Sequence, residues 1–444
     1  MDWDNLLKPY RLGCPKESPT TETADRTDFQ RDFDRIIFFA AFRRLQSKTQ
    51  VFPFPETDVI HTRLTHSLES ASVGRSLGTI IGKKIDDENI SGGDLGAIVC
   101  AACLAHDIGN PPFGHSGEDA IKEYFSSPNG EKVLAGLEDE QRRDFTQFDG
   151  NAMGFHLLTY SNPKVTQTQG GLGLTYPTLA AFTKYPRSAA GEIVKEGDIS
   201  EKKPGIFSCC VNDYEEIANE LGIEKKNNKE NYWHRHPLAF LTEAADDICY
   251  NIIDLEDGFK HGLVSYEEAA EYLKNIAEVY PGQRGLSDLE NIIDERNKIG
   301  YLRAKAINSL IYQVVDVFDN NEADIMTGNH TKSLCSQVKS QKDLENISVL
   351  SIEKIYKHRP VLQIEAAGFQ VIPGLLDTFF SALLNPKKSS SKKIKDLIPK
   401  DYLFDFEKEK YESIMNITAY VAGMTDNFAL ETYRNLKGIQ LPNC

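Results

Sequence analysis

Apolar residues recur at three- and four-residue steps along most of this chain, and this spacing is the strongest constraint on its fold. Residues 62–85 carry leucine, alanine and isoleucine mostly at these steps, which is the period of one face of an α-helix. Residues 95–105 are apolar on every side, which indicates a helix packed all round. Pro237 opens a third helical pattern, at a position where proline is tolerated. Strand-like alternation is short and scattered, so the sequence predicts an all-α protein.

Three polar stretches interrupt the helical pattern. Residues 161–173 are rich in glutamine, threonine and glycine, residues 187–203 alternate in charge, and residues 387–395 read KKSSSKKIK. Such stretches are typical of loops or insertions. We therefore predict a helical core over residues 1–284 with an insertion at about 187–235, followed by a C-terminal helical region over residues 285–444.

The formal net charge of −16 at pH 7 limits the kinds of molecule that the protein surface can bind. A molecule this acidic repels nucleic acid and anionic membranes as a whole. A polyanionic substrate would therefore need a local positive site, such as a divalent cation with a few arginines and lysines.

The beginning of the sequence and its cysteines predict a cytoplasmic protein. Met1-Asp2-Trp3-Asp4 has no basic region before an apolar stretch, and no segment approaches the length of about 18 uninterrupted apolar residues that a membrane span needs. The 8 cysteines are irregularly spaced, which disfavours a disulfide framework. Cys100-x-x-Cys103 lies in an apolar run, so we expect this pair, and Cys209-Cys210, to be small buried apolar residues rather than metal ligands.

Two histidines and two aspartates have the chemistry of a metal site: His66, His106, Asp107 and Asp246. Imidazole and carboxylate together suit a divalent cation such as Mn, Mg, Fe, Co, Ni or Zn. His106 and Asp107 are neighbours, which would point apart within a helix, but residues 108–112 read IGNPP and end that helix at once. Asp246 interrupts an apolar run, and a buried carboxylate needs a partner. The alternative is a set of capped or ion-paired acids.

Eight stretches, in order along the chain, resemble the HD-domain deoxyguanosine triphosphate triphosphohydrolase family. They are AFRRLQSKTQV at 41–51, TRLTHSLE at 62–69, HDIGNPPFGHSGE at 106–118, FDGNA at 148–152, LTYPTLAAFTKYP at 174–186, RHPL at 235–238, EAADDI at 243–248 and YVAGMTD at 420–426. The resemblance implies a helical HD-domain core in which His66, His106, Asp107 and Asp246 hold the metal.

Asp247 is the rival for the fourth ligand position. We prefer Asp246 because Tyr250 and Asp254 then follow at four and eight residues, where relatives place the groups that contact the 3′-hydroxyl of the sugar. Residues at this spacing project from neighbouring parts of one side of a helix.

Three residues are candidates for phosphate binding and proton transfer. Arg63 lies one helical turn before His66, in the family's Arg-x-x-His pattern, and the resemblance implies that it binds a phosphate. The resemblance also assigns a His115/Glu118 pair to acid–base catalysis. Residues 116–119 have capping-box spacing, so we expect Glu118 in the first turn of a helix. Whether His115 accepts a proton from water or donates one to the 5′-oxygen stays open, and a structural histidine near a helix cap is the alternative.

Further residues stand where relatives contact the nucleotide. The resemblance places Asn110, Asn151, Lys184 and Tyr185 beside the site, and Arg44, Leu45 and Gln46 near the base and sugar, although an ordinary helix surface is nearly as good an account of the last three. We expect the remaining histidines, His156 among them, to be structural or exposed. Cys209-Cys210 and Pro177 depart from the family, which leaves the base preference open.

The resemblance implies hydrolysis of a deoxynucleoside triphosphate, with dGTP favoured, to a deoxynucleoside and inorganic triphosphate. It also implies a homo-oligomer, a tetramer or hexamer, and allows activation by a second nucleotide or by single-stranded DNA, with no membrane partner. One alternative is a phosphohydrolase of nucleoside monophosphates, cyclic nucleotides or alarmones. Another is a nucleic-acid-binding regulatory scaffold, although the basic run at 387–395 lacks aromatic residues for base stacking and is better explained as a solvated loop.

Overall fold

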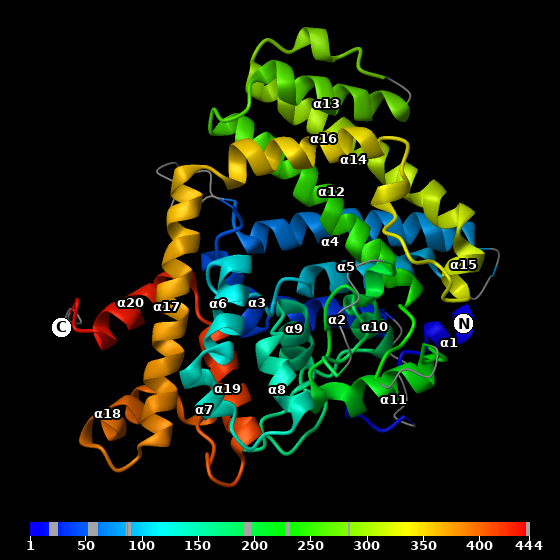
Figure 1. Ribbon diagram of the computed structural model, residues 1–444. Helices are drawn as coiled ribbons and strands as arrows, with labels where there is room; N and C mark the ends of the chain where they lie inside the picture. The colour runs from blue at the N-terminus through cyan, green and yellow to red at the C-terminus, as the bar shows by residue number, and fades with distance from the viewer. Residues whose placement is uncertain are drawn as a thin grey trace.

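The computed structural model describes residues 1–16, 25–51, 61–85, 87, 90–190, 197–226, 231–282 and 285–440. In these residues the chain forms twenty α-helices with short 3-10 and π-helical turns, and its β pairing is limited to isolated bridges (Figure 1). The prediction of an all-α protein is confirmed.

The helices keep the labels of Figure 1. They are α1 Trp3–Leu6, α2 Asp28–Ile37, α3 Ala40–Arg44, α4 Arg63–Lys84, α5 Gly92–Ala105, α6 Gly114–Ser126, α7 Pro128–Leu134, α8 Asp139–Thr146, α9 Gly150–Thr159, α10 Tyr176–Phe182, α11 Val211–Leu221, α12 Pro237–Lys260, α13 Tyr266–Val279, α14 Glu295–Asn320, α15 Glu322–Met326, α16 Gln341–Leu350, α17 Arg359–Leu384, α18 Ser389–Leu397, α19 Lys410–Ala422 and α20 Asp426–Leu436.

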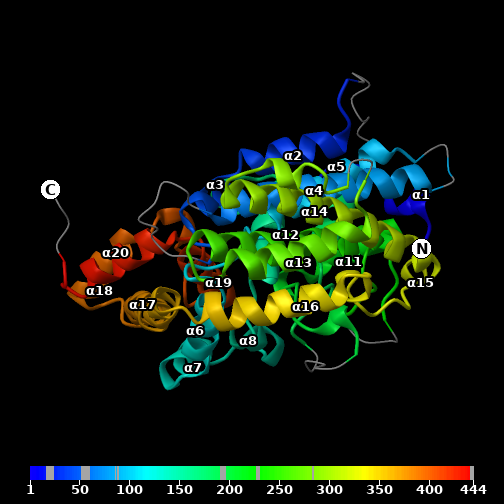
Figure 2. The same cartoon turned by 90° about the horizontal axis from the view of Figure 1, so that it is seen from above.

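Helices α4, α5 and α12 pack together at the centre of the molecule (Figure 2). A capping box at Thr62 starts α4. Pro237 is the first residue of α12, as the sequence predicts. Glycines let α4 and α5 approach closely, because a Cβ at Gly78 would lie 2.6 Å from the carbonyl oxygen of Leu95. From Leu95 to its end α5 is buried except at Ala97, which fits its apolar sequence.

Buried apolar side chains form two clusters. The larger one surrounds α4, α5 and α12 and includes α14, whereas the smaller one joins α6, α8 and α9 to α17 and α19. Helices after residue 285 therefore contribute to both clusters. The predicted division at residues 284 and 285 adjoins residues 283–284, which lie outside the described residues, as do residues 191–196 and 227–230 of the predicted insertion. This division stays a prediction.

Helix α17 stands beside α6 along one edge of the molecule (Figure 1). Among the described residues it is the one helix long and apolar enough to cross a membrane on length and composition alone. Half of its apolar window is buried within the protein, and a core helix passes the same test. Its apolar side chains, such as Ile372 and Leu376, belong to the smaller core cluster.

The basic run at 387–395 is not the loop that its composition predicts. Residues from Ser389 onward form α18, which packs against α17. Ser391 is buried and Ile394 is packed against the smaller core cluster, so tertiary contacts favour a helix where local composition favours a loop. Lys392 and Lys393 remain exposed, as expected for a solvated segment.

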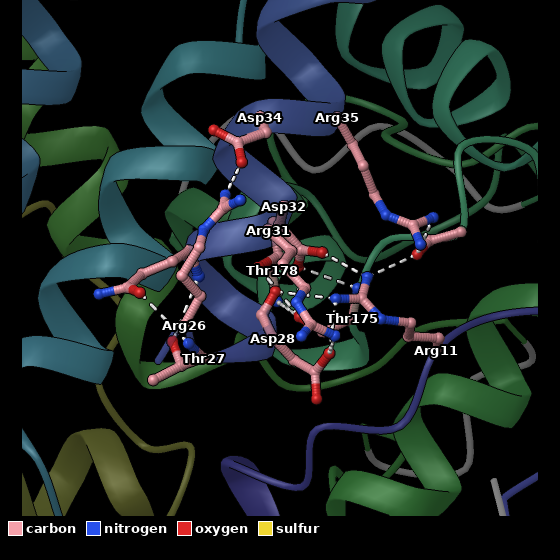
Figure 3. Close-up of polar contacts among 12 residues, drawn as sticks. Arg11, Arg26, Thr27, Asp28, Arg31, Asp32, Asp34, Arg35, Thr175 and Thr178 are labelled. Carbon is pink, nitrogen blue, oxygen red and sulfur yellow. Dashed lines mark hydrogen bonds and ion pairs between the residues drawn. The ribbon is translucent and has the colours of Figure 1, made fainter. Parts of the chain in front are cut away.

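A buried polar network fastens the N-terminal segment to α2 and to the start of α10 (Figure 3). The fully buried carboxylate of Asp32 accepts hydrogen bonds from Arg11 Nη1 at 2.6 Å, Thr175 Oγ1 at 2.6 Å and Thr175 N at 3.0 Å. Arg11 also bonds to Asp28. Because Thr175 is the N-cap of α10, the network fixes the helix that leads to Lys184.

Replacing Asp32 with alanine is expected to lower the free energy of unfolding by about 3 to 5 kcal/mol, because it leaves Arg11 without its buried partner. Asp34 is the matched control on the same helix, since its ion pair with Arg26 is exposed and Asp34→Ala should cost about 1 kcal/mol or less. Urea unfolding of both variants measures the difference. Equal costs would show that the buried network contributes nothing beyond a surface pair.

Candidate active site

A cavity of about 540 Å³ opens where α4, α5, α6, α12 and α17 meet. It gathers most of the site residues predicted from the sequence. Those in its wall are Arg63, His66, His106, Asp107, Asn110, His115, Glu118, Asn151, Lys184, Tyr185, Asp246 and Tyr250.

The side chains of His66, His106 and Asp246, three of the predicted metal ligands, meet at one point in the cavity wall. His66 Nε2 is 3.0 Å and His106 Nε2 is 3.4 Å from Asp246 Oδ1, and the donor atoms of these three residues lie within 4.8 Å of one another. Asp107 Oδ1 is 3.5 Å from His106 Nε2. His106 Nδ1 donates to the carbonyl of Cys103 at 2.6 Å, which leaves the lone pair of Nε2 facing the cluster. Two imidazoles and two carboxylates of this arrangement fit a divalent cation.

The end of helix α5 explains how the adjacent residues His106 and Asp107 can both face the same cluster. His106 is the C-cap of α5, and residues 107–109 turn out of the helix, so Asp107 faces the same point as His106. Burial alone would raise the pKa of Asp107, but Arg63, His106 and His66 lower it to about 2. The carboxylate is therefore ionised, as a metal ligand must be.

Of the two adjacent aspartates on α12, Asp246 is the one that meets the histidines. Its second oxygen accepts from Lys184 Nζ at 2.5 Å, and despite burial this lysine and His106 hold its pKa well below the usual range. Asp247 also lines the cavity, but burial, together with Glu243 and Asp246, raises its pKa to about 8. This geometry favours Asp246 as the fourth ligand.

Arg63 bridges the cluster and the open cavity. It is buried, and its Nη1 donates to Asp107 Oδ2 at 3.0 Å. Its Nε is buried without a hydrogen-bond partner in the structure. Because only part of this guanidinium is paired with Asp107, its remaining N–H groups can donate to a phosphate oxygen.

His115 and Glu118 form the expected pair, 3.0 Å apart between Nδ1 and Oε2. The His115 side chain is 79% exposed, whereas Glu118 is buried and accepts from the Gly150 N–H at 2.7 Å. Burial would raise the pKa of Glu118, but His115, Lys203 and the Gly150 N–H lower it to about 2. An ionised Glu118 fixes the orientation and tautomer of a histidine that reaches into solvent.

The expected position of Glu118 in the first helical turn is wrong. Helix α6 begins at Gly114, two residues before the capping-box pattern, so Glu118 is its fifth residue. Phe113 and Gly114 both have positive φ, and the Phe113 N–H donates to Asp426 Oδ1 at 3.0 Å. This left-handed turn, held by a residue more than three hundred positions away, starts the helix early.

Of the two predicted sugar-contacting residues, Tyr250 lines the cavity and Asp254 does not. Tyr250 is 38% exposed, whereas Asp254 is buried behind Tyr356, whose hydroxyl donates to Asp254 Oδ2 at 2.6 Å. The rings of Tyr250 and Tyr356 are 5.8 Å apart. Burial raises the pKa of Asp254 to about 7. Tyr356 is a site residue that sequence reasoning missed, because its partners lie about a hundred residues away.

Arg44, Leu45 and Gln46 lie elsewhere. Leu45 is buried in the larger core cluster, Gln46 is exposed, and Arg44 lines a second cavity with Tyr402 and Tyr420. Thr49, Gln50 and Val51, a few residues later, line the active-site cavity instead.

Other residues in the cavity wall were not predicted as site residues. They are Thr49, Gln50, Val51, Phe113, Gly114, Lys202, Lys203, Tyr356, Val361, Ile364 and Glu365. Lys203, 3.1 Å from Asp149, adds positive charge near Glu118. The two predicted asparagines already make hydrogen bonds within the protein. Asn110 Nδ2 donates to Asp107 Oδ1 at 2.5 Å, and Asn151 Nδ2 donates to Asp149 Oδ1 at 2.7 Å.

Comparison with known proteins assigns the family. The HD domain matches residues 63–158, and the phosphohydrolase-associated domain matches residues 337–435. Over 99% of its length the chain is 39% identical to the whole of a deoxyguanosinetriphosphate triphosphohydrolase-like protein of Synechocystis, and it is 37% identical, with both chains fully covered, to one of Pseudomonas aeruginosa. A deoxyguanosinetriphosphate triphosphohydrolase of Yersinia pestis is 30% identical, with 92% of this chain and 93% of that protein covered. The chain therefore belongs to the HD-domain deoxyguanosinetriphosphate triphosphohydrolase family and is a nucleotide phosphohydrolase.

Proposed function

We propose that this chain hydrolyses deoxynucleoside triphosphates, with dGTP preferred, to a deoxynucleoside and inorganic triphosphate. One observation carries the proposal: the His66, His106 and Asp246 cluster, Arg63 and the His115–Glu118 pair share one cavity. The names of relatives that match nearly the whole chain support the triphosphohydrolase reaction and the choice of dGTP.

The residues divide the work between charge and proton transfer. A divalent cation bound by His66, His106, Asp107 and Asp246 would supply positive charge against the phosphoryl oxygens. Arg63, which lines the cavity, would bind the phosphate through its guanidinium. His115, held at Nδ1 by Glu118, would exchange a proton at Nε2 with the reacting water or the 5′-oxygen.

Product analysis tests the reaction. Each dNTP is incubated separately with the chain and Mn or Mg, and the products are separated by chromatography. We expect deoxyguanosine and inorganic triphosphate in equal amounts from dGTP. Release of phosphate or pyrophosphate instead would point to a different bond and overturn the proposal. Turnover of nucleoside monophosphates, cyclic nucleotides or alarmones in preference to every dNTP would favour the alternative substrate class.

Tyr356→Phe is expected to reduce kcat/KM for dGTP by about 10-fold, because it removes the hydroxyl that orients the proposed 3′-hydroxyl acceptor Asp254. Steady-state kinetics with dGTP and with 2′,3′-dideoxyGTP measure the effect. The dideoxy substrate lacks the 3′-hydroxyl, so it should react poorly with the wild type and lose little more in the variant.

Tyr280→Phe is the matched control for this prediction. Tyr280 also donates to an aspartate, Asp316, but this pair is not part of the cavity wall. Its substitution should leave both kcat/KM values unchanged. Equal losses with dGTP and the dideoxy substrate in Tyr356→Phe would show that Tyr356 acts on something other than the 3′-hydroxyl.

Assembly and regulation stay predictions. We expect a homo-oligomer, a tetramer or hexamer, whose mass light scattering can measure. Activation by a second nucleotide or by single-stranded DNA is tested by adding each to a dGTP assay at fixed metal concentration.

A further inference from the structure

A buried histidine and two adjacent free thiols lie together outside the active-site cavity. Cys209 and Cys210 belong to the 3-10 turn η3 (Ser208–Cys210) directly before α11, and His156 lies on α9. The two sulfur atoms are 3.6 Å apart, and His156 Nδ1 is 3.7 Å from Cys209 Sγ and 3.5 Å from Cys210 Sγ. The three donor atoms thus form a nearly equilateral triangle.

This triangle has the size of one face of a tetrahedral zinc site. Zinc–sulfur bonds of about 2.3 Å and zinc–nitrogen bonds of about 2.0 Å, at tetrahedral angles, place two sulfurs about 3.8 Å apart and a sulfur and a nitrogen about 3.5 Å apart. The separations of 3.6, 3.7 and 3.5 Å among the donor atoms match these edges. Thiolate and imidazole are also the ligands that zinc favours.

Neighbouring residues hold the donors in this arrangement. The buried carboxyl of Asp144 on α8 accepts from the Ser208 N–H at 3.0 Å and from the Tyr411 hydroxyl at 2.7 Å, which fixes the turn that carries the cysteines. The His156 ring stacks on Tyr160, with ring centroids 4.7 Å apart. These contacts fix the turn that carries the two thiols and the ring that carries the imidazole nitrogen.

Charge and exposure at the turn favour a bound cation. Cys210 is the N-cap of α11, and a bound divalent cation ionises a thiol that coordinates it. Asp213 lies in the first turn of α11 and adds acidic character. Cys209 is an exposed residue, whereas His156 and Cys210 are buried, so the cluster lies next to the protein surface at Cys209.

We propose that His156, Cys209 and Cys210 bind one divalent cation of the zinc class at a second site, with the fourth position open on the Cys209 side. On binding, each thiol releases its proton to solvent, and the two thiolates balance the charge of the cation. The cation would join α9 to the start of α11. Because the Gly150 N–H at the start of α9 bonds to Glu118, the site steadies the helix that supports the proposed catalytic carboxylate.

Cobalt(II) binding to the metal-free, reduced full-length chain tests the proposal. A thiolate ligand gives cobalt(II) an intense near-ultraviolet charge-transfer absorption, and the His66, His106 and Asp246 cluster contains no sulfur. We expect this absorption to saturate at one equivalent and to disappear when zinc displaces cobalt. It should persist in Asp246→Asn, so failure of the active-site metal proposal would not mimic failure of this one.

Variants assign the signal to these residues. Cys209→Ser/Cys210→Ser should lose the absorption and one equivalent of bound zinc, whereas Cys14→Ser, which alters an exposed cysteine elsewhere, should retain both. His156→Gln should lower zinc affinity by at least 10-fold. Absence of the absorption in the folded wild-type chain would overturn the proposal without any substitution. Its full retention in the double serine variant would overturn it as well.

Discussion

Asp246→Asn is expected to remove the bound metal and to reduce kcat/KM for dGTP by about 10³-fold or more, beyond the 10- to 100-fold typical of outer-shell partners. Asp246 Oδ1 is the atom that both histidines approach, and its carboxylate is ionised beside Lys184. An amide in its place loses the charge that attracts a cation. Metal content after dialysis and kcat/KM should be measured on the same sample.

Asp247→Asn is the matched control on the neighbouring residue. Because burial, Glu243 and Asp246 raise the pKa of Asp247 to about 8, its carboxyl is mostly protonated at pH 7, and asparagine has nearly the same shape and charge as that form. We therefore expect full metal content and a loss of less than about 10-fold, the size of one hydrogen bond. Equal or reversed losses would move the fourth ligand to Asp247.

The central helices could be predicted because their determinants are local. The capping box at Thr62, the all-apolar stretch of α5 and Pro237 at the start of α12 each act within a few residues. The same is true of His106 and Asp107. Both side chains face the same point because residues 108–112 end helix α5 directly after them. Local pattern therefore predicted the scaffold and the proposed ligands His66, His106 and Asp107, and Asp246 was proposed because it interrupts an apolar run.

Features fixed by distant contacts could not be predicted in this way. Helix α6 starts early because Asp426 holds the turn at Phe113, and α18 forms because α17 covers one side of it. Tyr356 reaches Asp254 across about a hundred residues. Local residue spacing does not predict such contacts, since they depend on how the helices pack in the folded protein.

The surroundings of Cys209 and Cys210 also could not be predicted from the sequence. Their sequence predicts small buried apolar residues, and Cys210 is buried, but Cys209 is exposed and both sulfurs lie beside His156. A histidine fifty residues earlier in the sequence gives no sign of this meeting. Only the packing of η3 against α9 shows it.

His115→Ala is expected to leave the metal bound while lowering kcat by about 10²- to 10⁴-fold, the usual contribution of one positioned acid–base group. The separation follows from the geometry: His115 pairs with Glu118 on α6, whereas the proposed metal-binding cluster is made of His66, His106 and Asp246. The proton-transfer role would be lost without loss of a ligand. Metal content and single-turnover rate on one sample of the variant measure both quantities.

Two further variants give this prediction its controls. His261→Ala removes another exposed histidine, at the end of α12 and outside the cavity wall, and should change neither quantity. Glu118→Gln keeps a side chain of the same size next to His115 but removes its ionised partner, so we expect a smaller loss of rate, again with the metal retained. If metal and rate fall together in His115→Ala, this histidine is a ligand or a structural support, and proton transfer must then be assigned to another group in the cavity.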